Sequence, residues 1–440
     1  MLIRNKATAL RLLDFKSLPM RAFHMTWFAF FLCFFGWFGI APLMPIVRAE
    51  LHLTKGQIGN IIIASVAITV LARLLVGWLC DRIGPRRCYA GLLILGALPV
   101  MGIGFSNSYE SFLLFRLAIG AIGASFVVTQ YHTSVMFAPN IVGTANATAA
   151  GWGNLGGGVT QMVMPLIFST FVAAGYSNWW SWRLAMIVPG VALLLAGIAY
   201  YYMTKDTPDG NFEELRERGD LARPSAAAGA FLEACKDHRV WALAVLYACC
   251  FGLELTIDNI AALYFVDYFK LDLQTAGILA GAFGMMNLFA RALGGIVSDR
   301  CAKFWGLRGR VLLLGAVIGL EGLALIAFSQ ARYLPLAVAG MLLTGLFVKM
   351  SNGATYSVVP FVNRRALGAV SGIVGAGGNV GAVLAGFLFK TESLSWPQAL
   401  LILGLAVTGA AALSLVVRFS EAEAHSAATS SMPAVAVAGD

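Results

Sequence analysis

Residues 73–82 read RLLVGWLCDR, and residues 291–300 read RALGGIVSDR. Both stretches follow one pattern, in which an arginine is followed four residues later by a glycine and eight residues later by an Asp-Arg pair. A second motif also occurs twice, as GNLG at 153–156 and as GNVG at 378–381. Two motifs that return in the same order at nearly the same spacing indicate that one unit was duplicated.

The composition places the duplicated unit in a membrane. Hydrophobic residues make up 59% of the 440-residue chain and charged residues only 12%, whereas soluble proteins carry about 25% charge. A helix needs about 20 apolar residues to cross a membrane. Twelve apolar segments of about this length or more cover residues 23–46, 57–80, 88–106, 110–137, 143–174, 183–203, 239–265, 272–298, 309–329, 333–359, 366–389 and 396–418. The sequence therefore predicts an all-α membrane protein with twelve transmembrane helices in two six-helix repeats.

The distribution of basic residues predicts the orientation. Lys and Arg gather in the N-terminal arm and in the loop after every second segment, and the other loops hold one or two cations at most. Cytoplasmic loops retain positive charge, so we expect both termini in the cytoplasm. This asymmetry and the membrane phospholipid account for the net charge of +9, which leaves no need for a nucleic-acid partner.

The same patterns divide the chain into five parts. The predicted parts are a cytoplasmic arm (1–22), an N-terminal six-helix half (23–203), a cytoplasmic central loop (204–238), a C-terminal six-helix half (239–418) and a disordered cytoplasmic tail (419–440).

The stretch GWGNLG at 151–156 also matches the dinucleotide fingerprint GxGxxG, but it lacks the context. That fingerprint needs a preceding strand and an acidic residue about 20 positions later, and no carboxylate occurs between Glu110 and Asp206. The sequence shows no nucleophile paired with a base, no metal-binding cluster and no CxxC spacing among its seven cysteines. We therefore expect no enzyme activity, no cofactor and no metal.

Several stretches resemble one transporter family. GWLCDRIGPRR (77–87) resembles the loop between the second and third helices of the major facilitator superfamily, and AGWGNLGGGVTQMVMP (150–165) with GAGGNVGA (375–382) resembles the glycine-rich motifs of its nitrate/nitrite porters. Residues 251–265 and 273–299 are similar to the plant, algal and cyanobacterial high-affinity nitrate transporters. The resemblance runs from about residue 20 to 418 and implies the major facilitator fold and alternating access. It also implies a gating role for a set of loop residues, Gly77, Asp81, Arg82, Gly84 and Arg86.

Arg73 and Arg291 occupy the same place in the repeated motif. Each precedes its Asp-Arg pair by eight residues, about 12 Å along a helix, which is near the middle of an apolar core about 30 Å thick. Such a charge faces either a substrate site or a carboxylate in an ion pair. The planar guanidinium suits a small planar oxyanion such as nitrate or nitrite, because it donates paired hydrogen bonds. The resemblance implies the same two residues as substrate ligands.

Glycines and two asparagines accompany the arginines. The glycines of the two motifs are Gly151, Gly153, Gly156, Gly157, Gly158, Gly375, Gly377, Gly378 and Gly381. Small residues let helices approach closely, so these helices either slide against their neighbours or pack statically. Asn154 and Asn379 add hydrogen-bonding groups at a similar depth. The resemblance implies that both motifs flank the substrate and move during transport.

The seventh segment carries Tyr247, Phe251, Glu254 and Asp258 at intervals of 4, 3 and 4 residues, on one helical face. Aromatic rings can enclose a planar anion, although an aromatic stripe also serves simple packing. The resemblance places Tyr247, Phe251, Phe126 and, from the first segment, Phe38 in the substrate pocket.

Glu254 and Asp258 are candidates for proton coupling. Import of a monovalent anion opposes a negative interior by about 2.3 kcal/mol per 100 mV, so favourable import needs at least two protons. The alternative is that Asp258 lies at the outer mouth and is only solvated. Lys349, with Asn352 nearby, adds a charge that pairs or binds a ligand, and His132 is either a packed polar residue or another proton site.

The sequence therefore predicts proton-coupled uptake of nitrate, and also of nitrite, by a multi-pass protein of the plasma membrane (a bacterial inner membrane) that acts as a monomer. One alternative is a nitrate/nitrite exchanger, which needs the arginines but no proton carrier. Another is a nitrate receptor without transport, although the Ala/Ser-rich tail holds no signalling domain. The expected partners are nitrate, nitrite, protons and membrane lipid. The long cytoplasmic tail of the plant homologues is absent, which leaves a small accessory partner open.

Overall fold

The computed structural model describes residues 5–138, 141–220, 228–363 and 367–420. Within these ranges the chain is helical, and the only β-pairing is two isolated bridges. Eleven segments of this part of the chain are long and apolar enough to cross a membrane. The predicted all-α membrane class is therefore confirmed, whereas the predicted tail lies almost wholly outside the described residues.

Two groups of helices follow each other along the chain. The first group comprises α1 (Leu18–Phe38), η1 (Ala41–Leu43), α2 (Met44–Glu50), α3 (Lys55–Ile83), α4 (Pro85–Gly102), η2 (Ile103–Phe105), α5 (Tyr109–Gly120), η3 (Ala121–Ala124), α6 (Ser125–Met136), α7 (Val142–Ala173) and α8 (Asn178–Met203). The connecting segment holds α9 (Phe212–Glu217) and α10 (Ala228–Lys236). The second group comprises α11 (His238–Phe269), α12 (Leu273–Met285), η4 (Met286–Leu288), α13 (Ala290–Ser329), α14 (Leu334–Val358), η5 (Val359–Phe361), α15 (Leu367–Lys390), α16 (Trp396–Ala410) and η6 (Ala411–Val416).

Local sequence signals explain where several helices begin and end. Thr54 caps α3, because its hydroxyl accepts from the Gln57 amide while the Gln57 side chain accepts from the Thr54 amide. Between α3 and α4 the chain turns at Gly84, whose φ of 87° favours glycine, and Pro85 starts the next helix. The predicted segment boundaries therefore agree closely with the helices.

The predicted loop at 299–308 lies within α13, which extends from Ala290 to Ser329 but is interrupted by non-helical backbone at Trp305 and Gly306. Gly306 has a φ of 57°, which favours glycine. Two helices therefore meet at a kink inside the predicted loop, and Arg310 pairs with Asp299 across it at 2.6 Å. The eleven candidate segments include Leu273–Ser329 as one 57-residue segment.

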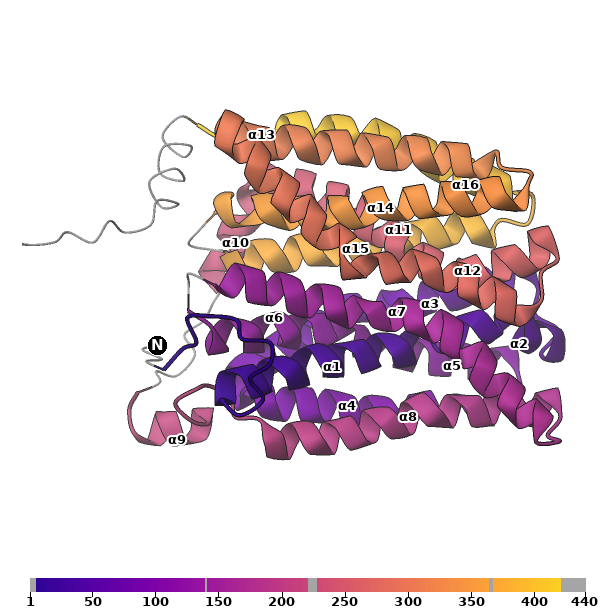
Figure 1. Cartoon of the computed structure of the whole chain (residues 1–440), viewed down its shortest axis with the longest axis horizontal. Coiled ribbons are helices and arrows are strands. Elements are labelled where there is room, and N and C mark those ends of the chain that lie inside the picture. The colour runs from indigo at the N-terminus through magenta and orange to yellow at the C-terminus, as the bar shows by residue number, and fades with distance from the viewer. Residues whose placement is uncertain (1–4, 139–140, 221–227, 364–366, 421–440) are drawn as a thin grey trace, which may run out of the picture.

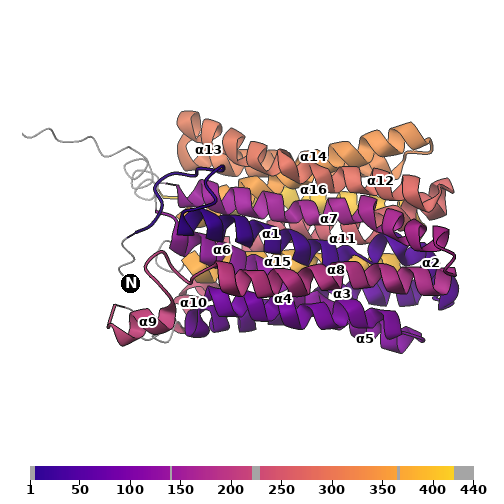
Figure 2. The same cartoon turned by 60° about the horizontal axis from the view of Figure 1, so that its bottom comes forward.

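The two groups lie side by side along their full length (Figure 1). Helix α7 of the first group lies against α12, and α3 lies against α15. The first described residues and the last lie at the same end of the bundle, together with α9 and α10 (Figures 1 and 2). We call this end of the bundle the terminal end. The opposite end, which carries α2, is called the distal end.

The N-terminal arm is docked at the terminal end. Ala7 forms a parallel bridge with Phe137, which follows α6, and Lys6 donates to the carbonyl of Ser134. Helix α1 already begins at Leu18, so the last residues of the predicted arm belong to the first helix.

Candidate functional site

Arg73 projects from α3 toward the second group. Its Nη1 donates a 2.6 Å hydrogen bond to the carbonyl of Gly375 in α15, and its guanidinium lies 5.5 Å from the Phe126 ring centroid and 5.8 Å from that of Phe251. The side chain is 8% exposed. Its cationic group is thus held between an aromatic ring from each group of helices.

Arg291 approaches the same place from α13. Its Nη2 donates to the Tyr247 hydroxyl at 3.4 Å, its Nη1 has no partner among the described residues, and the residue is 7% exposed. Tyr247 and Tyr356 interact electrostatically with both arginines. The structure therefore brings the two predicted arginines to one tyrosine pair.

Neither arginine is neutralised by a direct ion pair. Among the described residues, the salt bridges within 4.0 Å include neither Arg73 nor Arg291. The alternative in which each arginine serves a structural ion pair is therefore not supported. Two buried guanidinium groups with open donors make a site with surplus positive charge, which favours an anion.

Aromatic rings enclose the arginines. Tyr247 and Phe251 are stacked at 5.2 Å, Tyr356 meets Tyr247 edge-on at 5.1 Å, and Phe126 meets Tyr356 at 6.1 Å. Phe38 differs, because it packs against Phe34 and Trp37 within α1. Three of the predicted aromatic residues are thus gathered around the arginines, whereas the described ring contacts of Phe38 are with its own helix.

Tyr356 was missed in the sequence. Its hydroxyl has no hydrogen-bond partner among the described residues, and it lies on α14 just beyond the predicted Asn352. The spacing of four residues from Asn352, on the same helical face, was a signal that could have found it. A tyrosine hydroxyl with a free proton adds a neutral donor beside the two cations.

Asn154 and Asn379 are buried, and neither the oxygen nor the nitrogen of their side-chain amides has a partner among the described residues. Each follows a glycine that touches an aromatic residue: a Cβ on Gly153 would overlap the Phe30 ring, and one on Gly378 would lie 2.6 Å from the Phe251 ring. Buried amides normally find partners, so these two side chains are suited to a polar ligand.

The glycines of the two motifs make matching contacts. Gly156 abuts the carbonyl of Phe31 in α1, and Gly381 abuts the carbonyl of Ala248 in α11. Within each group the glycine-rich helix therefore packs directly on the backbone of the first helix of that group. The remaining glycines make different contacts, which are those of Gly151 with Asn287, Gly157 with Asp258, Gly158 with Gly284, Gly375 with Arg73 and Tyr356, and Gly377 with Ala244.

Glu254 is fully buried and tied to three donors. Lys349 Nζ lies 2.6 Å from its Oε1, the Asn287 amide donates to the same oxygen at 2.9 Å, and the Asn352 amide donates to Oε2 at 2.5 Å. Lys349 therefore forms an ion pair with Glu254, which is one of the two alternatives predicted for Lys349 from the sequence. Such an ion pair is stable only because its remaining hydrogen-bonding capacity is also used.

Asp258 is 2% exposed, so the interpretation that it is solvated at an outer mouth is wrong. Its Oδ1 has no hydrogen-bond partner in the described part of the chain, and its Oδ2 lies 3.2 Å from where a Cβ on Gly157 would be. The Gln161 amide donates to the Asp258 carbonyl at 2.5 Å. Asp258 thus lies at the contact between the two groups of helices, opposite the first glycine-rich motif.

His132 is a packed polar residue in this structure. Its Nδ1 lies 2.5 Å from the Tyr200 hydroxyl and its Nε2 lies 2.8 Å from the carbonyl of Lys205. One ring nitrogen therefore has a partner in the first group and the other has a partner in the connecting segment.

Polar contacts seal the two groups together at the distal end. Arg48 of α2 makes two 2.6 Å hydrogen bonds to Asp267 at the end of α11. Lys55, at the start of α3, donates to the carbonyl of Thr391 at 2.9 Å and to that of Leu394. Deeper inside, the buried Arg116 donates to Asn259 at 3.1 Å. We call these contacts the distal seal.

Removing the Arg48 side chain should loosen the distal seal. The pair is partly solvated, with side chains 33% and 20% exposed, so solvent screening limits its contribution and we expect Arg48→Ala to change accessibility only about two- to fivefold. The readout is the rate at which an externally added thiol reagent labels a cysteine introduced at Ala261, in a background without native cysteines. Arg332→Ala, at an exposed position of the same end, is the control. Equal labelling rates in all three proteins would show that the pair does not hold this end closed.

The predicted gating loop is bound to the segment after α8. A Cβ on Gly84 would overlap the Asp206 carboxylate, which accepts from the Arg86 amide at 2.8 Å, and Arg216 donates to the carbonyls of Asp81 and Arg82 at 2.7 and 2.6 Å. Burial raises the pKa of Asp206. Gly77 lies on α3 near Val127. All these contacts lie within the first group and its connecting segment.

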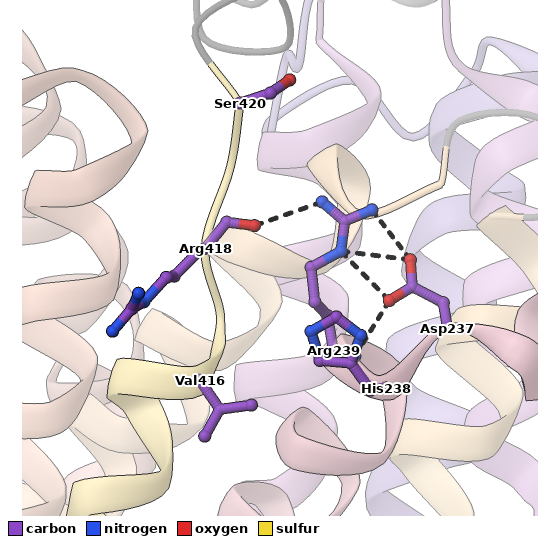
Figure 3. A pocket seen from close by; sticks show the side chains of 6 residues that line it. All are labelled: Asp237, His238, Arg239, Val416, Arg418 and Ser420. Atoms are coloured by element: carbon purple, nitrogen blue, oxygen red, sulfur yellow. Dashed lines mark hydrogen bonds and ion pairs between the residues drawn. The ribbon is translucent and has the colours of Figure 1, made fainter.

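A shallow pocket of about 620 Å³ at the terminal end is separate from the arginines (Figure 3). Its lining comprises Asp237, His238, Arg239, Val416, Arg418 and Ser420. Arg239 is bound to Asp237 at 2.8 Å and donates to the carbonyl of Arg418. The Arg239 cation is thus paired with Asp237, unlike Arg73 and Arg291, which are in no ion pair among the described residues.

Comparison with known proteins identifies the family. Residues 26–385 match the model of the Major Facilitator Superfamily. The chain belongs to this superfamily. It is 43% identical over 385 residues to "High affinity nitrate transporter 2.5" of Arabidopsis thaliana, covering 88% of this chain and 76% of the relative. It is 42% identical over 399 residues to "High-affinity nitrate transporter 2.3" of Oryza sativa subsp. japonica, with the same two coverages.

A cyanobacterial relative, "Nitrate/nitrite transporter NrtP" of Nostoc punctiforme, is 28% identical over 435 residues and is covered to 85% of its length, with 83% of this chain. The predicted membership of the nitrate/nitrite porters is therefore confirmed, and so is the expectation that the chain is not an enzyme. Among solved structures, an inward-facing bacterial homolog of the human lysosomal transporter Spinster has a TM-score of 0.71 at 15% identity, covering 92% of this chain and 99% of that one. This likeness shows the fold.

Proposed function

We propose that this member of the superfamily imports nitrate, and also nitrite, across the plasma membrane by alternating access coupled to protons. The observation that carries the proposal is the pair of buried arginines, one from each group, with no ion pair within 4.0 Å among the described residues. A monovalent oxyanion between them would be bound by both groups at once, which links substrate binding to the approach of the two groups. Two relatives are named as high-affinity nitrate transporters, which supports this proposal.

The topology belongs to the same proposal. We assign twelve transmembrane helices in two six-helix repeats, with halves at 23–203 and 239–418, and place the terminal end in the cytoplasm. The 57-residue segment Leu273–Ser329 is long enough for two spans of about 20 residues. The matching glycine contacts of α7 on α1 and of α15 on α11 support the repeat. The arm (1–22), the central loop (204–238) and the tail (419–440) then lie on the cytoplasmic side.

The proposed alternating access is supported by where the two groups touch. With the distal seal closed, the substrate exchanges with the terminal end; when the seal opens, the arginines face the outside. The gating loop around Gly77 and Asp81, and the glycine-rich helices beside the site, would shift between these two arrangements. Because glycine leaves no side chain at the contacts, two backbones can slide past each other at low cost.

Proton coupling is proposed for the carboxyl groups beside the site. Asp258 has an unpaired oxygen and faces the other group across Gly157, so its protonation would change the charge at the moving contact. Glu254 belongs to the same coupling site through its ion pair with Lys349. A cycle with two protons and one anion carries one net positive charge inward, which a negative interior favours.

The test uses proteoliposomes with the unaltered protein and labelled nitrate. With two protons per nitrate, an imposed negative potential of about 100 mV without a pH gradient should concentrate nitrate about 50-fold. An exchanger would take up label only against internal nitrite or nitrate, and a receptor would bind nitrate without any uptake. These outcomes separate the three functions in one preparation.

Asp258→Asn should remove one transported proton while leaving the anion site intact, since the amide keeps the shape and cannot titrate. We expect it to lose accumulation driven by potential alone and to retain counterflow of labelled against unlabelled nitrate. Asp220→Asn, at an exposed position, is the control. Accumulation by Asp258→Asn equal to that of the unaltered protein would remove this residue from the coupling site.

A further inference from the structure

A third carboxyl group is buried behind the coupling site and was not found in the sequence. Glu321 lies on α13 and is 0% exposed, and neither of its carboxyl oxygens has a hydrogen-bond partner among the described residues. The Ser351 hydroxyl of α14 is close enough to interact with Glu321, but it forms no hydrogen bond within 3.5 Å among the described residues. A buried carboxylate without donors is costly, so this site favours a carboxyl group that carries a proton.

Charged and titratable groups reach Glu321 from two neighbouring helices. Helix α14 contributes Lys349, and helix α11 contributes Glu254 together with the thiols of Cys249 and Cys250. On the side of α16, the neighbour of Gly322 is the uncharged Thr408. Lys349 is thus the one cation near Glu321 in the described part of the chain, and it is already paired with Glu254 at 2.6 Å.

We propose that Glu321 binds the second of the two protons that are carried with each nitrate. This inference rests on the proposed proton-coupled function and adds a residue to it. Of the three carboxyl groups buried together here, Glu254 is satisfied by three donors, whereas Asp258 and Glu321 have oxygens without partners. Two carboxyl groups that can each take up and release one proton match the two protons that favourable anion import requires.

Lys349 connects Glu321 to the anion site. When Glu321 loses its proton, its negative charge competes with Glu254 for the Lys349 ammonium group. Glu254 then attracts Arg291 more strongly, because these two residues already interact electrostatically. When Arg291 moves toward Glu254, it binds the anion less tightly. Release of the Glu321 proton therefore favours release of nitrate, and release of nitrate favours release of that proton.

The proposal is tested by counting charges with Glu321→Gln in proteoliposomes. At an imposed negative potential of about 100 mV without a pH gradient, the unaltered protein should concentrate nitrate about 50-fold, and Glu321→Gln, with one proton left, should not concentrate it at all. The double variant Glu321→Gln/Asp258→Asn carries nitrate alone and should exclude it about 50-fold. Glu110→Gln, an exposed carboxylate, is the matched control and should behave as the unaltered protein does.

Each possible result of this experiment either supports or contradicts the proposal. Accumulation by Glu321→Gln equal to the control overturns the inference and leaves proton coupling intact. If the unaltered protein carries one proton per nitrate, the second proton site is rejected but proton coupling stands. If it carries no proton, both proton coupling and this inference are rejected. Counterflow of nitrate by Glu321→Gln shows that the variant is folded.

A second measurement needs no variant. The unaltered protein, with glutamate labelled by carbon-13, is followed by infrared difference spectroscopy during a pH change. A labelled carbonyl stretch of a buried, protonated glutamate that disappears as the pH rises is the expected result, and the absence of this band at every pH contradicts the proposal.

Discussion

Replacing Arg73 or Arg291 by lysine is expected to weaken nitrate binding about 10- to 100-fold, although the positive charge remains. Lysine keeps the charge but loses the planar fork that donates two hydrogen bonds to one anion, and a charge-assisted hydrogen bond contributes about 1.5–3 kcal/mol. Lysine also loses the stacking of Arg73 between Phe126 and Phe251. The measurement is a nitrate titration of the purified variants by calorimetry.

The control for both variants is Arg332→Lys, which makes the same exchange at an exposed position. Normal nitrate affinity in either folded site variant would exclude that arginine from the binding site. Normal affinity in both would leave the proposed function without its main support.

Gly158→Leu is expected to abolish transport while the protein still inserts into the membrane. A Cβ at this position would already lie 2.7 Å from the backbone of Gly284 and Met285 in the opposite group, so a larger side chain prevents the two groups from closing there. Overpacking of this kind costs about 1–3 kcal/mol or more, and here the cost falls on one arrangement of the groups. Nitrate uptake and the amount of folded protein in the membrane are measured together.

Two other glycines of α7 serve as comparisons. Gly143→Leu should be silent, since nothing lies within 4 Å of a Cβ there. Gly156→Leu should reduce the amount of folded protein, because it would strike the Phe31 carbonyl inside its own group. Full uptake by Gly158→Leu would show that this contact does not close during transport.

The helices were predictable because each apolar segment has to satisfy its own backbone hydrogen bonds in the membrane. Segment 143–174 and the helix Val142–Ala173 differ by one residue at each end. The predicted loop at 299–308 likewise contains the break in the helix at Trp305 and Gly306. Charged loops and helix breaks coincide where glycine or proline also interrupts the chain, as at Gly84, Pro85 and Gly306.

The arginine site was predictable in its residues but not in its geometry. Depth in the membrane singled out Arg73 and Arg291, and the structure brings them to Tyr247 and Tyr356. Their role as substrate ligands stays a prediction. No spacing along one helix could reveal that Arg73 reaches the carbonyl of Gly375, because that hydrogen bond joins residues far apart in sequence.

Glu321 and Arg116 were missed for a different reason. Each lies inside an apolar segment whose other charge, Arg310 or Glu110, is at the segment's edge, and a search for every intramembrane charge, rather than for repeated ones, would have found them. Their partners could not be inferred, since Arg116 meets Asn259 across the two groups. The pairing of Glu254 with Lys349 likewise depends on the rotation of two helices about their axes, which one sequence does not fix.

The partly exposed charges of the distal seal are sensitive to ionic strength. Arg48 and Asp267 are 33% and 20% exposed, and at 0.1 M salt dissolved ions screen exposed charges over about 10 Å. Arg73 and Arg291, at 8% and 7% exposure, are shielded from those ions. On the proposed alternating access, a higher ionic strength is therefore expected to weaken the closure of the distal end and to leave anion binding at the arginines unchanged.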